Sequence, residues 1–200
     1  MRLHLVRHGQ TDRNDCLIGR TDAALTVDGI AHVDAALRDL DYRHVVTSPL
    51  QRCQPMALSA AERRGVACRI DDDWVEMDFG DWDGLPVQDI RARYAEPFRA
   101  FYADPDKHPP PGGESWREVR RRVDRALRTT LGETDHAPLL IMTHGGAMRA
   151  ALSVACGYAF DQLWAFRLAH GTRLTLEIGL GPERALWGEI IALSQADPRS

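Results

Sequence analysis

The chain is 200 residues long, a length typical of one domain or of one domain with a small insertion. Apolar residues make up 44% of it and charged residues 27%, which excludes a disordered, collagen-like or coiled-coil chain as the main description. The formal net charge of −4 argues against a nucleic-acid-binding protein, because such domains usually carry a net positive charge.

The first part of the chain is predicted to alternate strands with helices. Thr26 is typical of a helix N-cap, and apolar residues follow it at helical spacing. Ser48, Pro49 and Gln51 have the pattern of a capping box with proline at the first helical position, so a helix is expected directly after Ser48. The predicted elements are a strand at 3–6, a helix at 27–40, a strand at 44–47, a helix at 49–64 and a strand at 67–70.

The pattern changes at 78–113, where glycines and prolines interrupt short helical pieces. We expect an irregular helical cap or lid there. After it, Ser115 and Glu118 form a second capping box ahead of an apolar stripe, and Arg120–Arg122 are expected on the solvated face of that helix. The remaining predicted elements are a helix at 116–131, a strand at 138–143, a helix that ends at 156, and closing strands at 172–178 and 184–191.

This order of elements predicts the α/β class. We expect a three-layer α/β/α sandwich with a mostly parallel central sheet. The sequence favours a single domain over 1–200, with the cap inserted at about 78–113. Ligands of such sheets bind beyond the carboxyl ends of the strands.

Several titratable side chains come directly after predicted strands. Arg7 and His8 follow the first strand, Arg52 follows the second, and His144 with Gly145 follows the strand at 138–143. We therefore expect two histidines and two arginines to meet at one edge of the sheet, although they are far apart along the chain. Glycine next to each histidine, as at Gly145, would let a ligand approach the backbone closely.

These residue types suit phosphoryl transfer. The neutral imidazole of His8 needs no base to act as a nucleophile toward phosphorus. Arg7 and Arg52 can stabilise the charge on the phosphoryl oxygens, and His144 adds a third donor if it is protonated. Glu76, in the polar stretch after the third strand, is the candidate general acid for the leaving alcohol. This scheme requires no metal ion and no other cofactor.

Taken together, the motifs resemble those of the histidine phosphatase superfamily, whose members have a phosphoglycerate-mutase-like fold. They occur in the family's order along nearly the whole chain. The matching residues are Arg7–Thr11 with Asn14, Gly19, Asp22, Leu25, Thr26 and Gly29, then Ser48–Leu50 with Arg52, Glu76 with Phe79 and Gly80, Trp82–Gly84, Gly113–Ser115 and Thr143–Gly146.

The resemblance implies a role for each of these side chains. His8 would be the phosphohistidine nucleophile and Glu76 the acid and base. Arg7, Arg52 and His144 would form the phosphate pocket, with Asn14 and Gly145 as further phosphate contacts. The chain departs mildly from the family pattern, since Cys53 and Pro55 stand where Ala and Thr are more usual.

The residues after Glu76 bear on which reaction is catalysed. Mutases of this family usually carry an arginine there, whereas this chain has Met77 and Asp78. A carboxylate would repel a second anionic group, which favours a phosphatase. Motifs at 76–82, 112–115 and 163–167 resemble the α-ribazole phosphatases, which act in cobalamin assembly. The alternatives are a broad-specificity histidine phosphatase, a phosphoglycerate mutase and an inactive module that binds phosphorylated ligands.

Other features have simpler interpretations. The acidic run Asp71–Asp73 lacks the spacing of an EF-hand, so we do not expect a calcium site. His4 and His8 lie too far apart on a strand to share a metal ion, so we expect His4 to be packed. One or two aromatic side chains of the cap are expected to line the pocket, from a set comprising Trp74, Trp82, Tyr94, Phe98, Phe101, Tyr102 and Trp116.

The sequence also indicates where the protein works and with what. It has no apolar run of membrane-spanning length and no secretory signal, and its four cysteines lack metal-binding spacing. We therefore expect a cytoplasmic protein with reduced thiols that contacts neither a membrane nor nucleic acid. The expected partner is a small phosphorylated metabolite, and a homodimer is left open.

Overall fold

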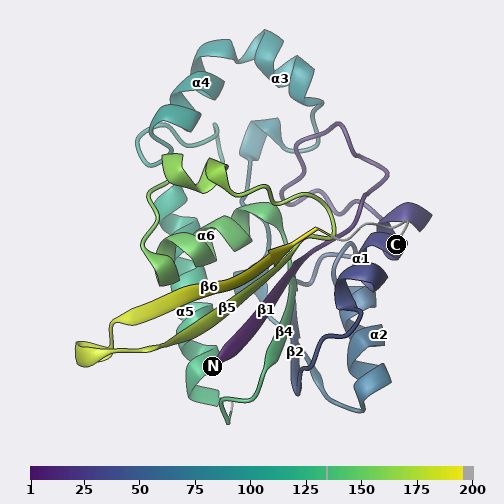
Figure 1. Cartoon of the computed structure of the whole chain (residues 1–200). Coiled ribbons are helices and arrows are strands. Elements are labelled where there is room, and N and C mark those ends of the chain that lie inside the picture. The colour runs from purple at the N-terminus through teal and green to yellow at the C-terminus, as the bar shows by residue number, and fades with distance from the viewer. Residues whose placement is uncertain (134, 196–200) are drawn as a thin grey trace.

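The computed structural model describes residues 1–133 and 135–195, so the last residues of the expected domain, 196–200, lie outside it. Its sheet has the order β3-β2-β4-β1-β5-β6 (Figure 1). Strands β1 to β4 pair in parallel, whereas β5 and β6 are antiparallel. The bounds are β1 (Arg2–Arg7), β2 (His44–Thr47), β3 (Cys68–Ile70), β4 (Leu139–Thr143), β5 (Arg173–Leu180) and β6 (Leu186–Ser194).

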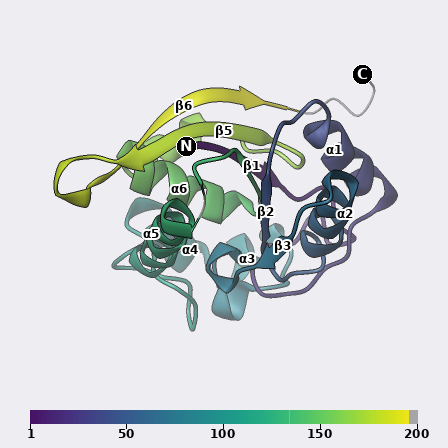
Figure 2. The same cartoon turned by 90° about the horizontal axis from the view of Figure 1, so that it is seen from below.

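Helices cover the sheet on both faces, which confirms the predicted α/β sandwich. Figures 1 and 2 show α1 and α2 on one face and α5 and α6 on the other. The helices are α1 (Val27–Leu37), α2 (Gln54–Arg64), α3 (Val87–Arg93), α4 (Ala95–Ala103), α5 (Trp116–Glu133) and α6 (Gly145–Cys156). Short 3₁₀ turns are η1 (Asp72–Trp74), η2 (Gly80–Trp82), η3 (Asp161–Ala165) and η4 (Pro182–Arg184).

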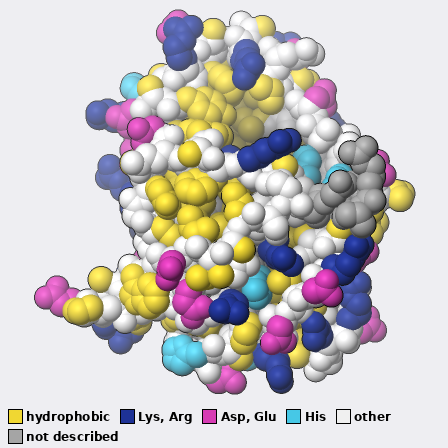
Figure 3. Space-filling view, in the orientation of Figure 1, with side chains coloured by type: hydrophobic (Ala, Val, Ile, Leu, Met, Phe, Trp, Pro, Cys, Tyr) yellow, Lys and Arg dark blue, Asp and Glu magenta, His cyan; other side chains and the backbone are white. Residues whose placement is uncertain are grey.

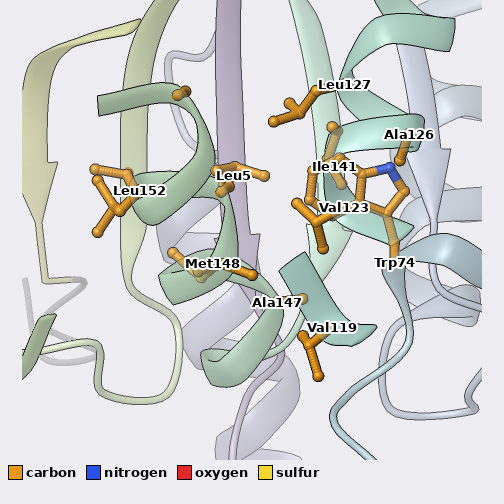
Figure 4. Close-up of a cluster of buried hydrophobic side chains, with 14 of the residues drawn as sticks. Leu5, Trp74, Val119, Val123, Ala126, Leu127, Ile141, Ala147, Met148 and Leu152 are labelled. Atoms are coloured by element: carbon orange, nitrogen blue, oxygen red, sulfur yellow. The ribbon is translucent and has the colours of Figure 1, made fainter. Parts of the chain in front are cut away.

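Each face of the sheet has its own hydrophobic core. Leu5 of β1 and Ile141 of β4 pack with Trp74 and with the apolar stripe of α5 (Figure 4). Val6, the next residue of β1, points to the other face and packs with α1 and α2. Fully burying such a side chain contributes about 1.5–3 kcal/mol, so these two cores fix the sheet and its strand ends.

Residues 78–113, the predicted cap, contain η2, α3 and α4. Figure 1 shows α3 and α4 at the end of the molecule toward which β1 runs. Trp82 is fully buried there and makes edge contacts with Phe98 and Phe101, at 5.5 and 5.9 Å between ring centroids. Figure 3 shows hydrophobic side chains gathered on the upper part of this face, which the cap forms. The cap is therefore packed around its own aromatic side chains and lies above the edge of the sheet where the site was predicted.

The prediction of a helix that begins after Ser48 is wrong. Residues 49–53 form bends and turns, and α2 begins at Gln54 with Pro55 as its second residue. The hydroxyl of Ser48 accepts from the ring of His144 at 2.8 Å. The side-chain amide of Gln51 donates to the carbonyl of Asp22, whose carboxylate accepts from the Gln51 backbone amide at 2.7 Å. Tertiary contacts therefore use the side chains that would otherwise have capped a helix.

Other helix ends agree better with the sequence. Thr26 caps α1 by accepting from the Gly29 amide at 3.0 Å, but α1 ends at Leu37 rather than at residue 40, and Asp39 has a positive φ of 61°. The capping box of Ser115 and Glu118 is confirmed, with the Ser115 amide donating to the carboxylate at 2.8 Å. Within residues 1–133 and 135–195, no helix combines the length and the apolar character needed to cross a membrane.

Candidate active site

The register of the central strands brings two histidines together. Arg7 pairs with Thr143 across the parallel strands β1 and β4, so the residues that follow them, His8 and His144, are neighbours at the carboxyl edge of the sheet. Their ring centroids lie 5.2 Å apart, and both rings are buried. The predicted convergence of His8 and His144 is therefore observed.

His8 has a defined proton position. Its Nδ1 lies 2.8 Å from the carbonyl oxygen of Gly9, which can only accept, so Nδ1 carries the proton and Nε2 of the neutral ring carries the lone pair. Burial, followed by the positive charges of Arg7 and Arg52, holds the pKa of His8 well below its ordinary value of 6.5. The ring is thus neutral near pH 7 and has a free nitrogen.

His144 is held in a different state from the one considered in the sequence. Its Nδ1 accepts from Nε of Arg52 at 3.2 Å, so Nε2 carries the proton and donates to the Ser48 hydroxyl at 2.8 Å. Burial and the charge of Arg52 hold the pKa of His144 well below 6.5. His144 is therefore neutral and acts as a link between Arg52 and Ser48.

Arg52 is fully buried beside these rings, but its guanidinium points largely to the backbone. Its Nη1 donates to the Thr21 carbonyl and its Nη2 to the Gly19 carbonyl, both at 2.8 Å. The remaining contact of Nη2 is with the Ile18 carbonyl at 3.5 Å. Most of the donors of Arg52 thus fix the loop at 18–21 and orient His144.

The side chain of Glu76 contacts the first residues of α6. Its Oε2 accepts from the Gly146 amide at 3.0 Å, and its Oε1 accepts from the Met77 amide at 2.9 Å. A Cβ at position 146 would lie 2.2 Å from Oε1, so the carboxylate occupies the space that a side chain there would fill. Glycine at 146 is therefore required by the position of Glu76.

Arg122 corrects the expectation of a solvated arginine run on α5. It is only 7% exposed, and its guanidinium donates to the carbonyls of Asp73, Val75 and Glu76 at 2.8, 2.7 and 3.1 Å. It also forms an ion pair with Glu114 at 3.0 Å. Arg122 thus holds the backbone that carries Glu76, a function that a run of three arginines did not reveal.

A cavity of about 320 Å³ opens at this edge of the sheet. Arg7, His8, Glu76, Gly145 and the exposed Asn14 line it, so five of the seven predicted site residues face one space. Arg52 and His144 are not among its lining residues, although the ring of His144 lies next to that of His8. The outer part is aromatic, with Phe79, Phe101, Tyr102, Trp116, Phe160 and Trp164.

Three aromatic side chains of the set expected from the sequence line the cavity, where one or two were expected. Phe101, Tyr102 and Trp116 do so, whereas Trp74 and Trp82 are core residues. Of the other aromatic side chains of the wall, Phe79 belongs to the cap, whereas Phe160 and Trp164 come from η3 and the turn before it, outside the cap. The separation of Phe160 and Trp164 from the cap in sequence explains why they were not expected.

Sequence reasoning missed two further residues of the cavity, His170 and Arg149. The ring of His170 lies 5.3 Å from that of His8, and burial together with the charge of Arg7 lowers its pKa to about 4. Arg149 lies one turn along α6 from Gly145. The available signal for Arg149 was its spacing of four residues from the strand-end glycine.

Two expectations about individual residues are not met. Gly9 was expected to admit a ligand, but a Cβ there would lie 1.9 Å from the Gly29 carbonyl oxygen, so the glycine permits contact with α1. Asp78 was expected to repel a second anionic group, yet it is not among the lining residues. It accepts from the Gly80 amide at 2.8 Å and lies 3.8 Å from Nε of Arg20.

The described residues 1–133 and 135–195 contain no group of three or more His, Cys, Asp or Glu side chains placed to hold a metal ion. His4, considered as half of a metal pair, is buried, and its Nδ1 lies 3.0 Å from the Thr175 hydroxyl. Its packing against β5 is as expected from the sequence.

Comparison with known proteins gives results that agree with this geometry. The chain is 30% identical over 199 residues to adenosylcobalamin/alpha-ribazole phosphatase of Salmonella typhimurium, which covers 94% of this chain and 98% of that protein. Among solved structures, mycobacterial glucosyl-3-phosphoglycerate phosphatase Rv2419c in complex with VO3 superimposes with a TM-score of 0.84 at 26% identity. That alignment covers 98% of this chain and 99% of the other.

A mycobacterial relative is considerably longer. The bifunctional protein Rv2228c of Mycobacterium tuberculosis is 36% identical over 160 residues, which cover 77% of this chain and 44% of that protein. This chain therefore spans less than half the length of that relative. The histidine phosphatase superfamily (branch 1) matches residues 3–186, nearly the whole chain. The chain thus belongs to the histidine phosphatase superfamily, as its motifs, its sheet and its paired histidines indicate.

Proposed function

We propose that the chain is a phosphomonoesterase that works through a phosphohistidine on His8, and that its substrate is α-ribazole-5′-phosphate. The observation that carries this proposal is the state of His8. The ring lines the cavity and is neutral near pH 7. Its one N–H proton is on Nδ1, which donates to the Gly9 carbonyl. A neutral imidazole with a free Nε2 is the nucleophile that attack on phosphorus requires.

In the first step, Nε2 of His8 attacks phosphorus and the bond between phosphorus and the ester oxygen breaks. The leaving oxygen takes a proton from the carboxyl of Glu76, which lines the same cavity. Burial and the charges of Arg7 and Arg52 keep His8 neutral beforehand, and the two charges then stabilise the phosphoryl group that it carries.

In the second step, a water oxygen attacks phosphorus in line with the P–N bond. The carboxylate of Glu76 takes one proton from this water, the P–N bond breaks, and His8 is restored with inorganic phosphate as the product. In this proposal Arg52 and His144 support the phosphate pocket without lining the cavity, since the charge of Arg52 acts on His8 and the ring of His144 lies 5.2 Å from that of His8. The scheme uses no metal ion, so turnover is expected to survive treatment with EDTA.

The aromatic part of the cavity supports a substrate with a ring. The ring centroids of Tyr102 and Trp164 lie 5.1 Å apart, as do those of Trp116 and Phe160, and all four side chains line the same cavity as Glu76. Such a wall favours stacking on the base of a nucleotide-like monoester. The similarity to the adenosylcobalamin/alpha-ribazole phosphatase of Salmonella typhimurium points to the same substrate class.

A second candidate is a phosphatase or mutase acting on a phosphoglycerate. It is favoured by one observation: Asp78 does not line the cavity, whereas Arg13 and Arg149 do. A carboxylate or a second phosphate on the substrate would therefore meet cations rather than an anion.

Turnover on a panel of monoesters separates these candidates. The panel comprises α-ribazole-5′-phosphate, phosphoserine, the phosphoglycerates and sugar phosphates, with released phosphate and isomerised product both measured. We expect the highest kcat/KM on α-ribazole-5′-phosphate. Interconversion of phosphoglycerates with little free phosphate would replace the phosphatase by a mutase, and tight binding without acid-labile ³²P labelling would indicate an inactive binding module.

A further inference from the structure

Two guanidinium groups approach the same point in the cavity. A Cβ built on Gly145, at the start of α6, would lie 3.3 Å from Nη1 of Arg149 and 3.5 Å from Nε of Arg7. Both arginines line the cavity together with His8 and Glu76. Glycine at 145 therefore leaves a space that is bordered by two positive groups and by the N-terminal end of a twelve-residue helix.

Each of these guanidinium groups has an unused donor. Nη1 of Arg7 donates to the Leu168 carbonyl at 2.6 Å, and Nη1 of Arg149 contacts the Gly145 carbonyl at 3.3 Å. The two Nε atoms are buried, and neither has a hydrogen-bond partner among the described residues. A buried N–H without an acceptor costs free energy, which an anionic oxygen bound between the two groups would offset.

Arg52, the second arginine expected in the pocket, does not offer donors in this way. Its Nε and both Nη atoms already donate to His144 and to the backbone carbonyls at 18–21, and it does not line the cavity. The guanidinium groups next to Gly145 are thus those of Arg7 and Arg149, while the exposed Arg13 lines another part of the cavity. The two positive charges of Arg7 and Arg149 exceed the single negative charge that the carboxyl of Glu76 can carry, so the site keeps a net positive charge for a phosphate dianion.

Trp164 of η3 fixes the direction of the Arg149 side chain. The Cζ atom of Arg149 lies 4.4 Å from the centre of the Trp164 ring, within the range of a cation–π contact. Trp164 also lines the cavity and contacts Tyr102 of the aromatic wall. The same aromatic side chain therefore borders the place for the substrate's ring and supports the arginine beside its phosphate.

We propose that Arg149 is a further substrate-binding residue, whose guanidinium binds the substrate phosphate jointly with Arg7, and that Trp164 is its positioning residue. This inference rests on the proposed phosphatase function. The sequence motifs did not include Arg149, which lies within a helix, and Trp164 entered only as part of the motif at 163–167, with no role given to it.

Direct binding of inorganic phosphate, measured by titration calorimetry, tests Arg149. Arg149→Met keeps the length of the side chain and removes the charge, and we expect it to weaken phosphate binding about 10- to 100-fold, as for a lost hydrogen bond to a charged group. Arg149→Lys restores the charge without the forked geometry, so an intermediate loss is expected. The matched control is Arg128→Met on the exposed part of α5, with an affinity within about twofold of the original.

The outcomes separate the role of Arg149 from the function of the protein. Phosphate binding by Arg149→Met within twofold of the original overturns the role of Arg149, even if the original protein hydrolyses monoesters. If the original protein binds phosphate but hydrolyses no monoester, the proposed function is overturned. The role of Arg149 is then still decided by the ratio of phosphate affinities between the original protein and Arg149→Met. If the original protein does neither, both proposals fail.

A double-mutant cycle tests Trp164. We expect Trp164→Leu to weaken phosphate binding about 3- to 10-fold in the original protein, the size of a partly buried cation–π contact. In the Arg149→Met background it should cause no further loss, because the group that it positions is absent. Equal losses in both backgrounds would overturn the positioning role and assign the effect to general packing.

Discussion

The inner and outer ends of the cavity are built in different ways. The inner end is formed by residues that directly follow parallel strands, and the register of β1 and β4 sets the places of His8 and His144. The outer end is formed by α4, by η3 and by the first residue of α5, which come together only through the packing of the cap. Under the proposed function, the phosphate chemistry would therefore depend on the sheet and recognition of the leaving group on the cap.

This difference has a consequence for substitutions. A change at the inner end alters a group that touches the reacting atoms, so it should affect every substrate. A change in the aromatic wall should affect substrates according to the size of their leaving group. Variants of each end can therefore be assayed on a ring-bearing monoester and on a small one. The difference between the two substrates shows how far phosphate chemistry and leaving-group recognition are separate.

Loss of His8 is expected to have the largest effect. We expect His8→Ala to lower turnover of all monoesters by at least about 10⁴-fold, because no other group supplies the nucleophile. Steady-state assays and acid-labile ³²P labelling measure the effect, and circular dichroism checks the fold. The exposed His108→Ala is the control. Substantial activity or labelling in His8→Ala would remove His8 from the mechanism.

Glu76→Gln should distinguish substrates by their leaving group rather than by their size. We expect a loss of about 10²–10⁴-fold on alkyl phosphates, whose leaving oxygen needs a proton. Aryl phosphates depart without protonation, so the loss on them should be much smaller. The comparison uses kcat on glycerol phosphate and on p-nitrophenyl phosphate, and equal losses on the two would argue against Glu76 as the acid.

Gly146→Ala tests whether the exact placement of that carboxyl matters. The added methyl group would lie 2.2 Å from Oε1 of Glu76, so the carboxylate must move. A displacement of about 1 Å can cost about 10²-fold in rate, and we expect a loss of that order on alkyl phosphates. Gly132→Ala on α5, where a Cβ meets nothing within 4 Å, is the matched control and should keep full activity.

Much of the inner end could be predicted from the sequence because it depends on local order. Each of Arg7, His8, His144 and Gly145 directly follows a run of buried strand residues. Parallel pairing of the strands then brings their backbones to the same edge of the sheet, independently of how the other segments pack. The boundaries of the strands were also predicted closely, since apolar runs end where the polar motifs begin.

The sequence did not reveal how polar side chains would be used once they were buried. Arg52 and Arg122 were expected to face a phosphate and the solvent, respectively, but both donate largely to backbone carbonyls of other segments. The helix expected after Ser48 was displaced for the same reason, because His144 takes the hydroxyl. Such choices depend on which acceptors the tertiary structure leaves unpaired, and no local pattern records that.

A change in the aromatic wall should have a moderate and selective effect. We expect Tyr102→Ala to raise KM for α-ribazole-5′-phosphate about 3- to 10-fold, the range for a lost aromatic contact, with little change for glycerol phosphate. Trp187→Leu, on the exposed strand β6 and outside the cavity, is the control. Equal increases in KM for the large and the small substrate would show that the wall does not recognise the leaving group.

The smallest expected effect concerns stability at acid pH. The pKa values of His4, His8, His144 and His170 are all lowered, with burial as the largest cause. Below pH 6.5 the unfolded chain takes up protons on these rings that the folded state excludes, so stability must fall as the pH falls. The stability that His170 contributes is present above pH 6.5 and is lost by about pH 4, the pKa of its ring in the folded state. Melting temperatures measured from pH 7.5 to 4.5 should therefore decline steadily.

His170→Gln isolates one ring of this set at the inner end of the cavity. The variant has no proton to exclude at position 170, so its melting temperature should fall less steeply between pH 6.5 and 4 than that of the original chain. His108→Gln, an exposed replacement, should leave the slope unchanged. An unchanged slope in His170→Gln would mean that this ring takes up a proton as readily in the folded as in the unfolded chain, so that burial and the charge of Arg7 do not lower its pKa.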